Sequence, residues 1–439
     1  AGANCPVGGE KIQTGLDSNR NGVLDPAEVT ATSYVCNGSS RLYAFSSALL
    51  GGVCPRGGVR IDTGIDANGN GALDPSEIQP SLTQYVCNVY LVDVSEGFQS
   101  ACALVSDGTV SCWGDNSLGQ LGDATLPTAL TPVSVPGVAG ASAISVGAFH
   151  ACALLTDGTA RCWGDNEFGQ LGNGTATPQA APVAVSGLTG ATTIAAAGFH
   201  SCAVISGGTA QCWGSNDIGQ LGDGTTTERH GPVAVTGLTG AVQLTGGLAH
   251  TCARRSGGDV KCWGDNEAGQ LGDATSVNSS TPVTVFGLAG AVDLSAGSYH
   301  NCAALTDGTA WCWGYNSNGQ LGDGSVVADS LQPTMVALGT SVSRVAGGFA
   351  HSCAQGTDGT VWCWGYNSNG QLGDGTLVDE NTPVQVTGLA RAARITAGGT
   401  SSCAVLTDGS ARCWGANDSG QLGDGTTSDS GSPVPVAFP

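Results

Sequence analysis

One hairpin pattern, ACALVSDGTVSCWG at residues 101–114, sets the architecture of most of this chain. Apolar and small residues alternate into Asp107-Gly108 and out of it again, which is the pattern of two strands joined by a tight turn. A three-residue turn with its glycine in the left-handed conformation places Cys102 opposite Cys112. The stretch therefore predicts a β-hairpin that its own disulfide can close.

The hairpin pattern recurs seven times from residue 91, at a spacing of about fifty residues. In each copy the second cysteine is followed by Trp, and W-G-x-N and G-Q-L-G come next. The cysteine pairs that we expect to form disulfides are Cys102–Cys112, Cys152–Cys162, Cys202–Cys212, Cys252–Cys262, Cys302–Cys312, Cys353–Cys363 and Cys403–Cys413. Seven copies of four short strands, each with one Trp, predict a seven-bladed β-propeller, and a solenoid is the alternative.

The end of the repeat array favours a closed ring over a solenoid. The last copy lacks the G-L-x-G-A segment that links the earlier copies. We expect residues 90–94, just before the first copy, to supply the missing strand and to join the ends. The 71 glycines among 439 residues fit this all-β protein, because short strands need many tight turns.

The repeat has a recognisable consensus, G-x-x-H-x-C-A-L-x-x-D-G-T-x-x-C-W-G-x-N-x-x-G-Q-L-G-D-G-T, over residues 91–439. This consensus resembles the repeat of the regulator of chromosome condensation family, which implies a seven-bladed propeller. Members of that family serve as nucleotide exchange factors, as protein inhibitors or as binding platforms, so the resemblance implies a fold more than a function. The 27 acidic and nine basic residues of the repeats argue against a chromatin-bound exchange factor.

Charge and cysteine content restrict the partners and the compartment. The chain has 14 Lys and Arg against 35 Asp and Glu, a net charge of −21, which argues against nucleic acid as a partner. No stretch of about 18 apolar residues is present, so no membrane span is expected. Eighteen cysteines without a C-x-x-C motif indicate disulfides and an oxidising compartment. We therefore expect a secreted, extracellular or cell-surface protein.

Two small modules precede the propeller, at residues 1–40 and, after a linker, within residues 41–90. Cysteines frame each module, which predicts the bridges Cys5–Cys36 and Cys54–Cys87. Between them, residues 17–28 and 66–77 match a twelve-residue EF-hand-type calcium loop, with glycine at position six and glutamate at position twelve. The predicted Ca²⁺ ligands are Asp17, Asn19, Asn21, Val23, Asp25 and Glu28, and Asp66, Asn68, Asn70, Ala72, Asp74 and Glu77.

The flanks of these loops differ from an EF-hand, because residues 5–16 are glycine-rich and have no helical stripe. The modules resemble the cysteine-framed calcium-loop repeats of exported bacterial proteins. We expect one structural Ca²⁺ in each loop, and two Asx-rich turns without metal are the alternative.

Histidine precedes the first cysteine by two positions in five copies, at His150, His200, His250, His300 and His351. A metal ring around the axis is one interpretation of this column. Single imidazoles fifty residues apart do not form a chelate by sequence, so we expect each to bond the backbone of its own blade. We likewise expect Asn116, Gln120 and their equivalents to bond turn backbones, and Trp113 and its equivalents to pack between blades.

Function is expected where the repeats differ. Trp311 and Trp362 stand in a column that is Ser, Arg, Gln or Lys in the other copies, and Tyr315 and Tyr366 stand in a column that is Asp, Ser or Ala. These four aromatic residues predict one exposed partner-binding surface. Local packing within the blade is the alternative.

No nucleophile–base pair, phosphate loop or carboxylate pair stands out from the repeats, so the sequence predicts a non-enzymatic interaction or structural protein. The expected partner is a protein, a second copy of the chain or a carbohydrate. A self-assembling extracellular filament or surface-layer subunit and a secreted protein inhibitor acting through one propeller face are the alternatives. A hydrolase with its site at the axis is a third.

Overall fold

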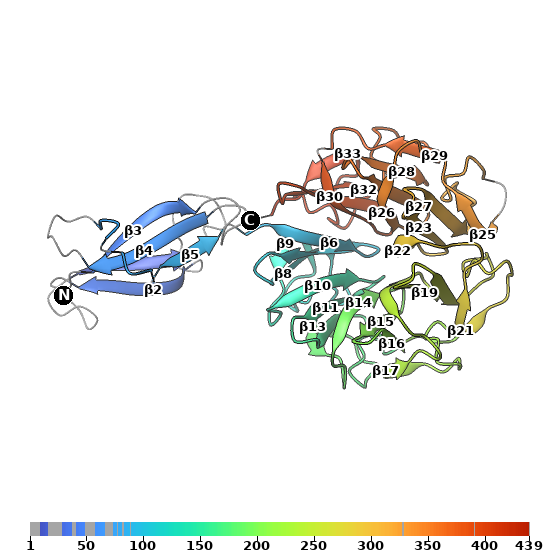
Figure 1. The fold of residues 1–439 in the computed structure, drawn as a ribbon, viewed down its shortest axis with the longest axis horizontal. Coiled ribbons are helices and arrows are strands. Elements are labelled where there is room, and N and C mark those ends of the chain that lie inside the picture. Colours follow the sequence, from blue (N-terminus) through green and yellow to red (C-terminus); the bar gives the residue numbers. More distant parts are fainter. Residues whose placement is uncertain are drawn as a thin grey trace. The chain divides into compact units, whose positions relative to one another are not determined.

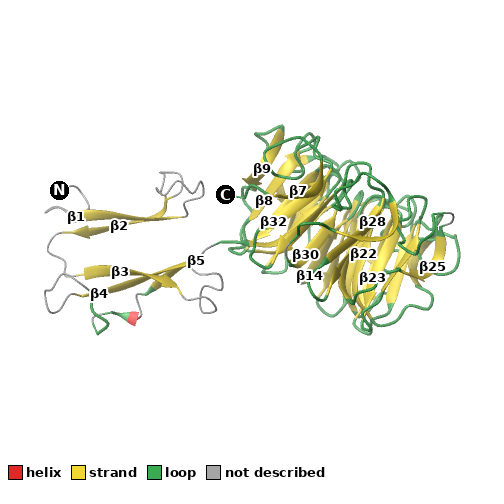
Figure 2. Ribbon diagram, turned by 90° about the horizontal axis from the view of Figure 1, so that it is seen from above, coloured by secondary structure: helices red, strands yellow, loops and turns green. Residues whose placement is uncertain are grey.

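The computed structural model describes residues 9–15, 29–36, 41–48, 58–65, 73–76, 78–80, 83–87, 89–326, 329–389 and 391–438. Strands make up the fold within these ranges (Figures 1 and 2), apart from one short helical turn at Pro80 that is red in Figure 2, so the fold is all-β there. The described residues include no helix of the length and apolarity that crossing a membrane requires. The chain divides into two compact units, residues 1–90 and 91–438.

The first unit has two small antiparallel sheets. One pairs β1 (Gly9–Gly15) with β2 (Val29–Cys36), and the other has the order β3 (Arg41–Ala48), β4 (Gly58–Ile65), β5 (Gln84–Cys87). Residues 41–48, which we expected to be linker, therefore form a strand that pairs along its whole length with β4. The calcium loop 17–28 and all predicted ligands of the second loop except Asp74 lie outside the described residues, as do Cys5 and Cys54.

The second unit is a propeller of seven four-stranded antiparallel sheets arranged around an axis (Figure 1), and each blade pairs its strands in chain order. The first four blades consist of β6 (Leu91–Glu96), β7 (Ser100–Val105), β8 (Val110–Asp115) and β9 (Thr128–Ser134); β10 (Ala141–Val146), β11 (His150–Leu155), β12 (Ala160–Gly164) and β13 (Gln179–Ala184); β14 (Ala191–Ala196), β15 (His200–Ile205), β16 (Thr209–Gly214) and β17 (Arg229–Ala234); and β18 (Ala241–Gly246), β19 (His250–Arg255), β20 (Val260–Gly264) and β21 (Ser279–Thr284).

The last three blades follow the same plan. They consist of β22 (Ala291–Ala296), β23 (His300–Leu305), β24 (Ala310–Gly314) and β25 (Ser330–Met335); β26 (Val342–Gly347), β27 (His351–Gly356), β28 (Val361–Gly365) and β29 (Glu380–Gln385); and β30 (Ala392–Ala397), β31 (Ser401–Leu406), β32 (Ala411–Gly415) and β33 (Ser430–Pro435).

Each central hairpin has the predicted register. In the second blade Cys152 lies directly opposite Cys162, and a disulfide joins them. The turn needs glycine at Gly158, whose φ is +79°, and a Cβ there would lie 3.0 Å from the Cα of Gly190. All seven expected bridges within the blades are present. The bridges Cys5–Cys36 and Cys54–Cys87 depend on cysteines outside the described residues and stay predictions.

The hydrophobic core lies between neighbouring blades. Trp163 of the second blade is completely buried among residues of the first blade, including Cys112, Leu121 and Val135. Its indole Nε1 donates a hydrogen bond to the carbonyl of Gln120 in the first blade, 2.9 Å away. The other six tryptophans of this column make the same bond to the blade before them. As predicted, this Trp column fills the space between blades.

The ring closes by contacts between complete blades. The seventh blade has its own fourth strand, β33, and Leu91 begins the first strand of the first blade, so residues 90–94 do not complete the last blade as we expected. Hydrogen bonds span the seam, among them Gly399 N to Gly97 O at 2.9 Å, Leu91 N to Gly409 O at 3.0 Å, and Trp113 Nε1 to Gln421 O at 2.8 Å. No strand needs to be exchanged because the same contacts that join other blades join the two ends.

Candidate functional site

The ring has two different faces because its blades are antiparallel meanders. Connections between first and second strands, and between third and fourth strands, emerge at the same end of a blade. We call this end the mouth face. The other end, which carries the Asp–Gly turns such as Asp107-Gly108 and the connections between blades, is called the turn face.

The long loops of the mouth face are built by repeated Asn and Gln side chains. In the second blade Asn166 Oδ1 accepts the backbone N–H of Leu171 at 2.9 Å. The Nδ2 group of Asn166 donates to the carbonyls of Thr175 and Thr177, each 3.0 Å away. The side-chain oxygen of Gln170 accepts a backbone N–H in the same loop. These columns bond turn backbones, as the sequence predicted.

The fifth and sixth blades break one contact of this network. In the fourth blade the carboxylate of Asp265 accepts the side-chain Nε2 of Gln270 at 2.7 Å. Tyr315 occupies the equivalent position in the fifth blade, and the buried Nε2 of Gln320 has no partner among the described residues. The amide of Gln371 in the sixth blade is unpartnered in the same way. An unsatisfied buried donor destabilises a protein, so these substitutions cost stability at both sites.

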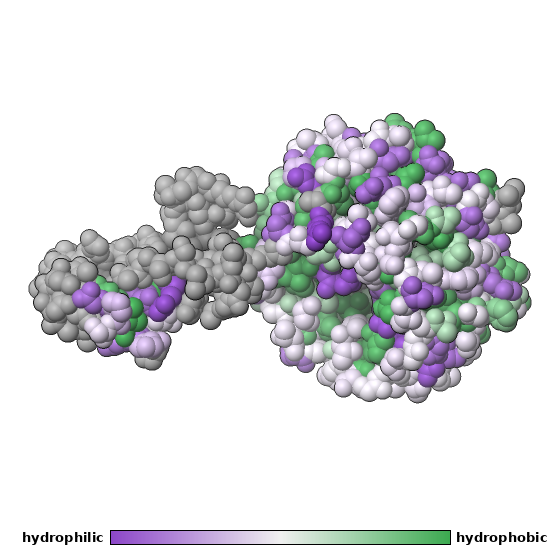
Figure 3. All heavy atoms as spheres, turned by 45° about the horizontal axis from the view of Figure 1, so that its top comes forward, coloured by the Kyte–Doolittle hydropathy of each residue, from purple (hydrophilic) through white to green (hydrophobic). Residues whose placement is uncertain are grey.

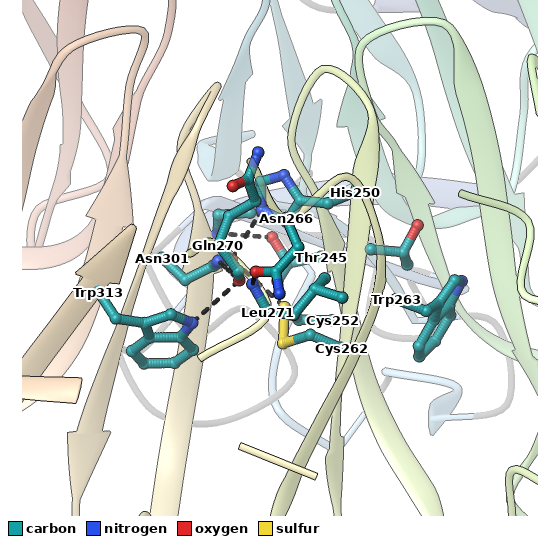
Figure 4. The surroundings of a disulfide bond; sticks show 12 residues. Thr245, His250, Cys252, Cys262, Trp263, Asn266, Gln270, Leu271, Asn301 and Trp313 are labelled. Atoms are coloured by element: carbon teal, nitrogen blue, oxygen red, sulfur yellow. Dashed lines mark hydrogen bonds between the residues drawn. A yellow bond between two sulfur atoms is a disulfide. The ribbon is translucent and has the colours of Figure 1, made fainter. Parts of the chain in front are cut away.

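The five histidines bond the neighbouring blade, which corrects our expectation that each bonds its own. His250 Nε2 lies 3.1 Å from Asn301 Oδ1 of the fifth blade, and Asn301 Nδ2 donates to the carbonyl of Gln270 at 2.8 Å (Figure 4). In the other four, Ser or Thr replaces Asn: the pairs are His150–Ser201, His200–Thr251, His300–Ser352 and His351–Ser402. No described group of three His, Cys, Asp or Glu side chains is placed to hold a metal.

These histidines are neutral and have a defined tautomer. Ser201 Oγ donates its only hydrogen to the carbonyl of Gln170 at 2.9 Å, so the hydrogen between Ser201 and His150 belongs to the imidazole Nε2. The Nδ1 atom is then a bare acceptor, and in all five it has no partner within the described part of the chain. Burial lowers the pKa of His250 to about 4 and that of His150 to about 3. The column is structural and joins five of the seven blade interfaces.

A cavity of about 200 Å³ lies on the axis, lined mainly by glycine, alanine and serine from all seven blades. Its only described ionisable wall residue is Glu96, which accepts a hydrogen bond from Ser401 Oγ at 2.7 Å. Burial raises the pKa of this carboxyl to about 8. Acid–base hydrolysis uses two positioned groups. A single carboxyl on the described wall is not such a pair, so the axis carries no argument for a hydrolase.

Two aromatic residues, Phe98 and Phe349, line this cavity and contact further rings. Phe98 makes edge-to-face contacts with Phe149 and Phe349, with ring centroids 5.6 and 6.0 Å apart. Phe199 lies 6.2 Å from Phe149. Figure 3 shows hydrophilic and hydrophobic residues interspersed on one side of the ring. Phe349 is 42% exposed, so this aromatic cluster presents apolar surface to solvent.

A second pocket of about 440 Å³ lies on the mouth face between the fourth, fifth and sixth blades. Its aromatic wall consists of Tyr299, Tyr315 and Phe349, and its acidic wall consists of Asp265, Glu267 and Asp329. Ala268, Gln270, Asn318 and Ala350 complete the described lining. This is the pocket to which a residue of the predicted aromatic set, Tyr315, contributes.

Exposed apolar side chains occur at equivalent loop positions of the same three blades. Val277, Val326, Leu377 and Val378 are 70%, 49%, 63% and 61% exposed. The corresponding stretches of the third and seventh blades contain Thr or Ser. We call these four residues the apolar rim. Large apolar side chains that the blade does not bury point to a contact surface.

The four predicted aromatic residues lie at two levels of their blades, and whether they bind one partner stays a prediction. Trp311 and Tyr315 are four residues apart along one extended segment, about 13 Å at 3.3 Å per residue. Trp311 lies toward the turn face and Tyr315 toward the mouth face, and both are half-buried. The indoles of Trp311 and Trp362 donate to Thr309 and Thr360 of their own hairpins.

Sequence reasoning missed most of the pocket, including Tyr299, Phe349, Glu267 and Asp329. Tyr299 and Phe349 lie in the two columns that precede the histidine column, and each of these columns holds an aromatic residue in only some of the blades. That variation was the available signal. It could not be interpreted without knowing which three blades converge.

Comparison with known families gives an independent assignment. The RCC1-like domain matches residues 62–354, and the regulator of chromosome condensation (RCC1) repeat matches residues 358–405 and 408–439. A second RCC1 repeat family matches residues 342–371 and 393–421. Residues 1–36 match a domain of unknown function (DUF7151). A comparison with curated protein sequences found no significant match.

Solved structures show the same fold. Yeast RCC1 (Prp20), crystallised with Kap60, is 22% identical, covers 79% of this chain and 85% of its own, and has a TM-score of 0.67. Prp20p from Saccharomyces cerevisiae, reported with its binding properties to Gsp1p and histones, gives the same score and identity, with 79% and 87% coverage. Human WBSCR16 is 23% identical over 74% of this chain and 88% of its own, with a TM-score of 0.65.

Proposed function

This chain belongs to the RCC1-like domain family, and we propose that it is a non-enzymatic protein-interaction platform that binds its partner through the mouth face. The observation that carries this proposal is the sector of the fourth to sixth blades, where the apolar rim and the pocket lie. A blade can be built without exposed Val277 or Leu377, because Thr and Ser occupy those positions in the third and seventh blades.

The solved yeast relative was crystallised with Kap60 bound, and its binding properties to Gsp1p and histones are reported. Those partners are its own. They support only the general idea that a ring of this architecture presents a protein-binding surface.

The mouth face also carries negative charge, which can select between partners. Its seven loops between third and fourth strands contain sixteen Asp or Glu residues and no Lys, Arg or His. Arg229 and His230, just beyond one loop, pair with Asp223 and Glu228. A partner with a basic surface is therefore favoured over an acidic one.

We further propose a secreted or cell-surface location with calcium-stabilised N-terminal modules. Seven disulfides, each within one blade, need an oxidising compartment to form and persist. The calcium proposal rests on the double match of residues 17–28 and 66–77 to a twelve-residue calcium loop.

The test replaces three of the four apolar-rim residues by the residues of other blades, as Val277→Thr, Leu377→Thr and Val378→Ser. Cross-linking of the natively exported protein and mass spectrometry identify the bound protein, and its purified form is titrated against wild type and variant. We expect the triple variant to fold normally and to bind at least about tenfold more weakly, because exposed apolar anchors dominate interface energies.

Phe286→Thr is the matched control. Phe286 is 59% exposed, lies in a connection between blades on the turn face, and corresponds to Thr236 and Thr387. This variant should bind like wild type. Equal binding by the triple variant, or a loss with Phe286→Thr alone, contradicts the mouth-face platform. If the cross-linked partner is a second copy of this chain, sedimentation will show a polymer, as the filament alternative predicts. If the partner is a tightly held enzyme, the result supports the inhibitor alternative.

A further inference from the structure

We propose that the pocket between the fourth, fifth and sixth blades binds an organic cation on an apolar stem, as the arginine or lysine side chain of a protein partner presents it. This inference rests on the proposed function and deepens it by naming the group of the partner that the mouth face recognises. It stands on the combination of an aromatic wall, an acidic wall and a cavity of suitable size.

The aromatic wall is rigid. Tyr315 N donates to the carbonyl of Tyr299 at 3.0 Å, and the two rings meet edge to face with centroids 6.3 Å apart. Phe349, on the sixth blade, supplies a third ring. Tyr299 and Phe349 are 37% and 42% exposed, so their rings are available to a ligand. Ring faces carry partial negative charge and attract ammonium and guanidinium groups within about 6 Å.

The acidic wall has three carboxylates and no base. Asp265 is buried and held by Gln270 Nε2 and by the backbone N–H of Glu267. Asp329 Oδ1 accepts the backbone N–H of Asn316 at 3.0 Å, which fixes that carboxylate at the pocket edge. Among the described residues, none of the three acids is in an ion pair. The wall therefore offers net negative charge that a ligand can neutralise.

The fit to a cation is specific to this pocket. The corresponding site two blades earlier lies between the second, third and fourth blades. It has Asp165 and Glu167, but Ser215 stands in place of Tyr315 and Leu248 in place of Phe349. The volume of about 440 Å³ lies within the roughly 300–1,000 Å³ range of small-ligand sites. A neutral apolar ligand would leave three carboxylates uncompensated at its side, and an anion would be repelled. A cation with a methylene stem satisfies both walls.

With Tyr315 in place of an acceptor, Gln320 Nε2 has no partner among the described residues, so this tyrosine comes at a cost to the stability of the fold. Tyr315→Ser recreates the third-blade arrangement, in which Ser215 Oγ accepts Gln220 Nε2 at 3.1 Å. This variant removes the aromatic wall while giving Gln320 a partner, so we expect it to fold. Tyr366→Ser makes the same change in the sixth blade, and Tyr366 does not line this pocket.

The experiment uses ligand-observed NMR titration of the full chain with N-acetyl-arginine-N-methylamide, its lysine counterpart, the neutral citrulline counterpart and tetramethylammonium. We expect the arginine compound to bind and the citrulline compound, which has nearly the same shape, to bind at least about tenfold more weakly. Raising NaCl from 50 to 500 mM should weaken the arginine compound, because the attraction is electrostatic.

The variants localise the site. Tyr315→Ser and Glu267→Gln should each weaken the arginine compound by about three- to fivefold, the effect of one partly exposed cation–π or charge contact. Tyr366→Ser and Glu167→Gln, the matched changes in other blades, should bind like wild type. Equal binding of arginine and citrulline compounds overturns the proposal, and so does an equal effect of Tyr315→Ser and Tyr366→Ser.

The tetramethylammonium arm distinguishes the source of the cation. Tighter binding of tetramethylammonium than of both side-chain analogues overturns the assignment to a partner's side chain and points to a free quaternary ammonium compound. Because every probe is a defined small molecule, absence of cation binding overturns this inference alone. The interaction platform is tested separately by the apolar-rim variant.

Discussion

The imidazole of His250 donates a hydrogen bond to the side-chain carbonyl of Asn301, the residue directly before Cys302 on the neighbouring blade. The amide of Asn301 then donates to the carbonyl of Gln270, which also accepts the indole N–H of Trp313 (Figure 4). One backbone carbonyl of the fourth blade thus receives two side chains of the fifth. Relays of this kind join the disulfide-closed central hairpins at five of the seven blade interfaces.

The histidine relay predicts loss of stability in mild acid. The pKa values of His150, His200 and His300 are lowered to about 3 in the folded protein, while unfolded histidines titrate near 6.5. Between these values the unfolded chain binds more protons, so the free energy of unfolding falls as pH drops from about 6.5, by up to about 1.4 kcal/mol per pH unit for each histidine. Thermal melts from pH 7.5 to 4 measure this slope.

His300→Ser separates the histidine effect from carboxylate titration. Ser401 occupies this position in the seventh blade, so serine is compatible with the blade. The variant should be less stable than wild type at pH 7.5, and the difference should shrink as the pH falls. Parallel melting curves over the whole range would contradict the assignment of a neutral buried His300.

Glu96 predicts the opposite pH dependence. Burial raises its pKa to about 8, so the folded protein keeps a proton that the unfolded chain loses above about 4.5. The free energy of unfolding therefore falls as pH rises from 4.5 to 8, by up to about 1.4 kcal/mol per unit. Glu96→Gln keeps an oxygen that can accept from Ser401. It should raise Tm at pH 8 and change it little at pH 4.5.

The two tryptophans of the fifth-blade hairpin should differ sharply. Trp313 is completely buried between blades, so Trp313→Ala should lower the free energy of unfolding by about 3–5 kcal/mol. Trp311 is half-buried, and Arg161 and Arg412 occupy its position elsewhere. Trp311→Arg should cost less than about 1 kcal/mol. Urea unfolding measures both, and equal losses would mean that Trp311 belongs to the core of its blade.

Much of the propeller could be predicted because its information is local and repeated. The ten-residue cysteine offset determines the hairpin, and seven copies determine the ring. The partner of His250 could not be predicted, because Asn301 is 51 residues away on another blade. The separation of Trp311 from Tyr315 was within reach, since a strand of known rise puts them at opposite ends. The cation pocket was not, because three blades contribute its walls.

Disulfide pairing can be measured directly. We expect all 18 cysteines to be bridged, with nine bonds inside their own repeats, including Cys5–Cys36 and Cys54–Cys87. The intact mass of the protein isolated from its native source should rise by 18 hydrogens on reduction. Peptide mapping should place every propeller bridge between cysteines ten positions apart. Free thiols in the unreduced protein, or bridges between blades, would contradict this pairing.

Calcium removal should affect the two units differently. Small modules bury little apolar surface, so bound metal and disulfides supply much of their stability. Three acidic ligands in each loop imply weak affinity, on the order of 10⁻⁴–10⁻³ M. We expect EGTA to increase proteolysis within residues 1–90 and to leave the thermal transition of residues 91–438 nearly unchanged.

Glu28→Gln, at the bidentate position of the first loop, should reproduce the effect of EGTA on that module in millimolar calcium. Glu10→Gln in β1 (Gly9–Gly15) is the control and should not. Equal protease sensitivity of residues 1–90 with and without calcium would show that the loops are turns without metal.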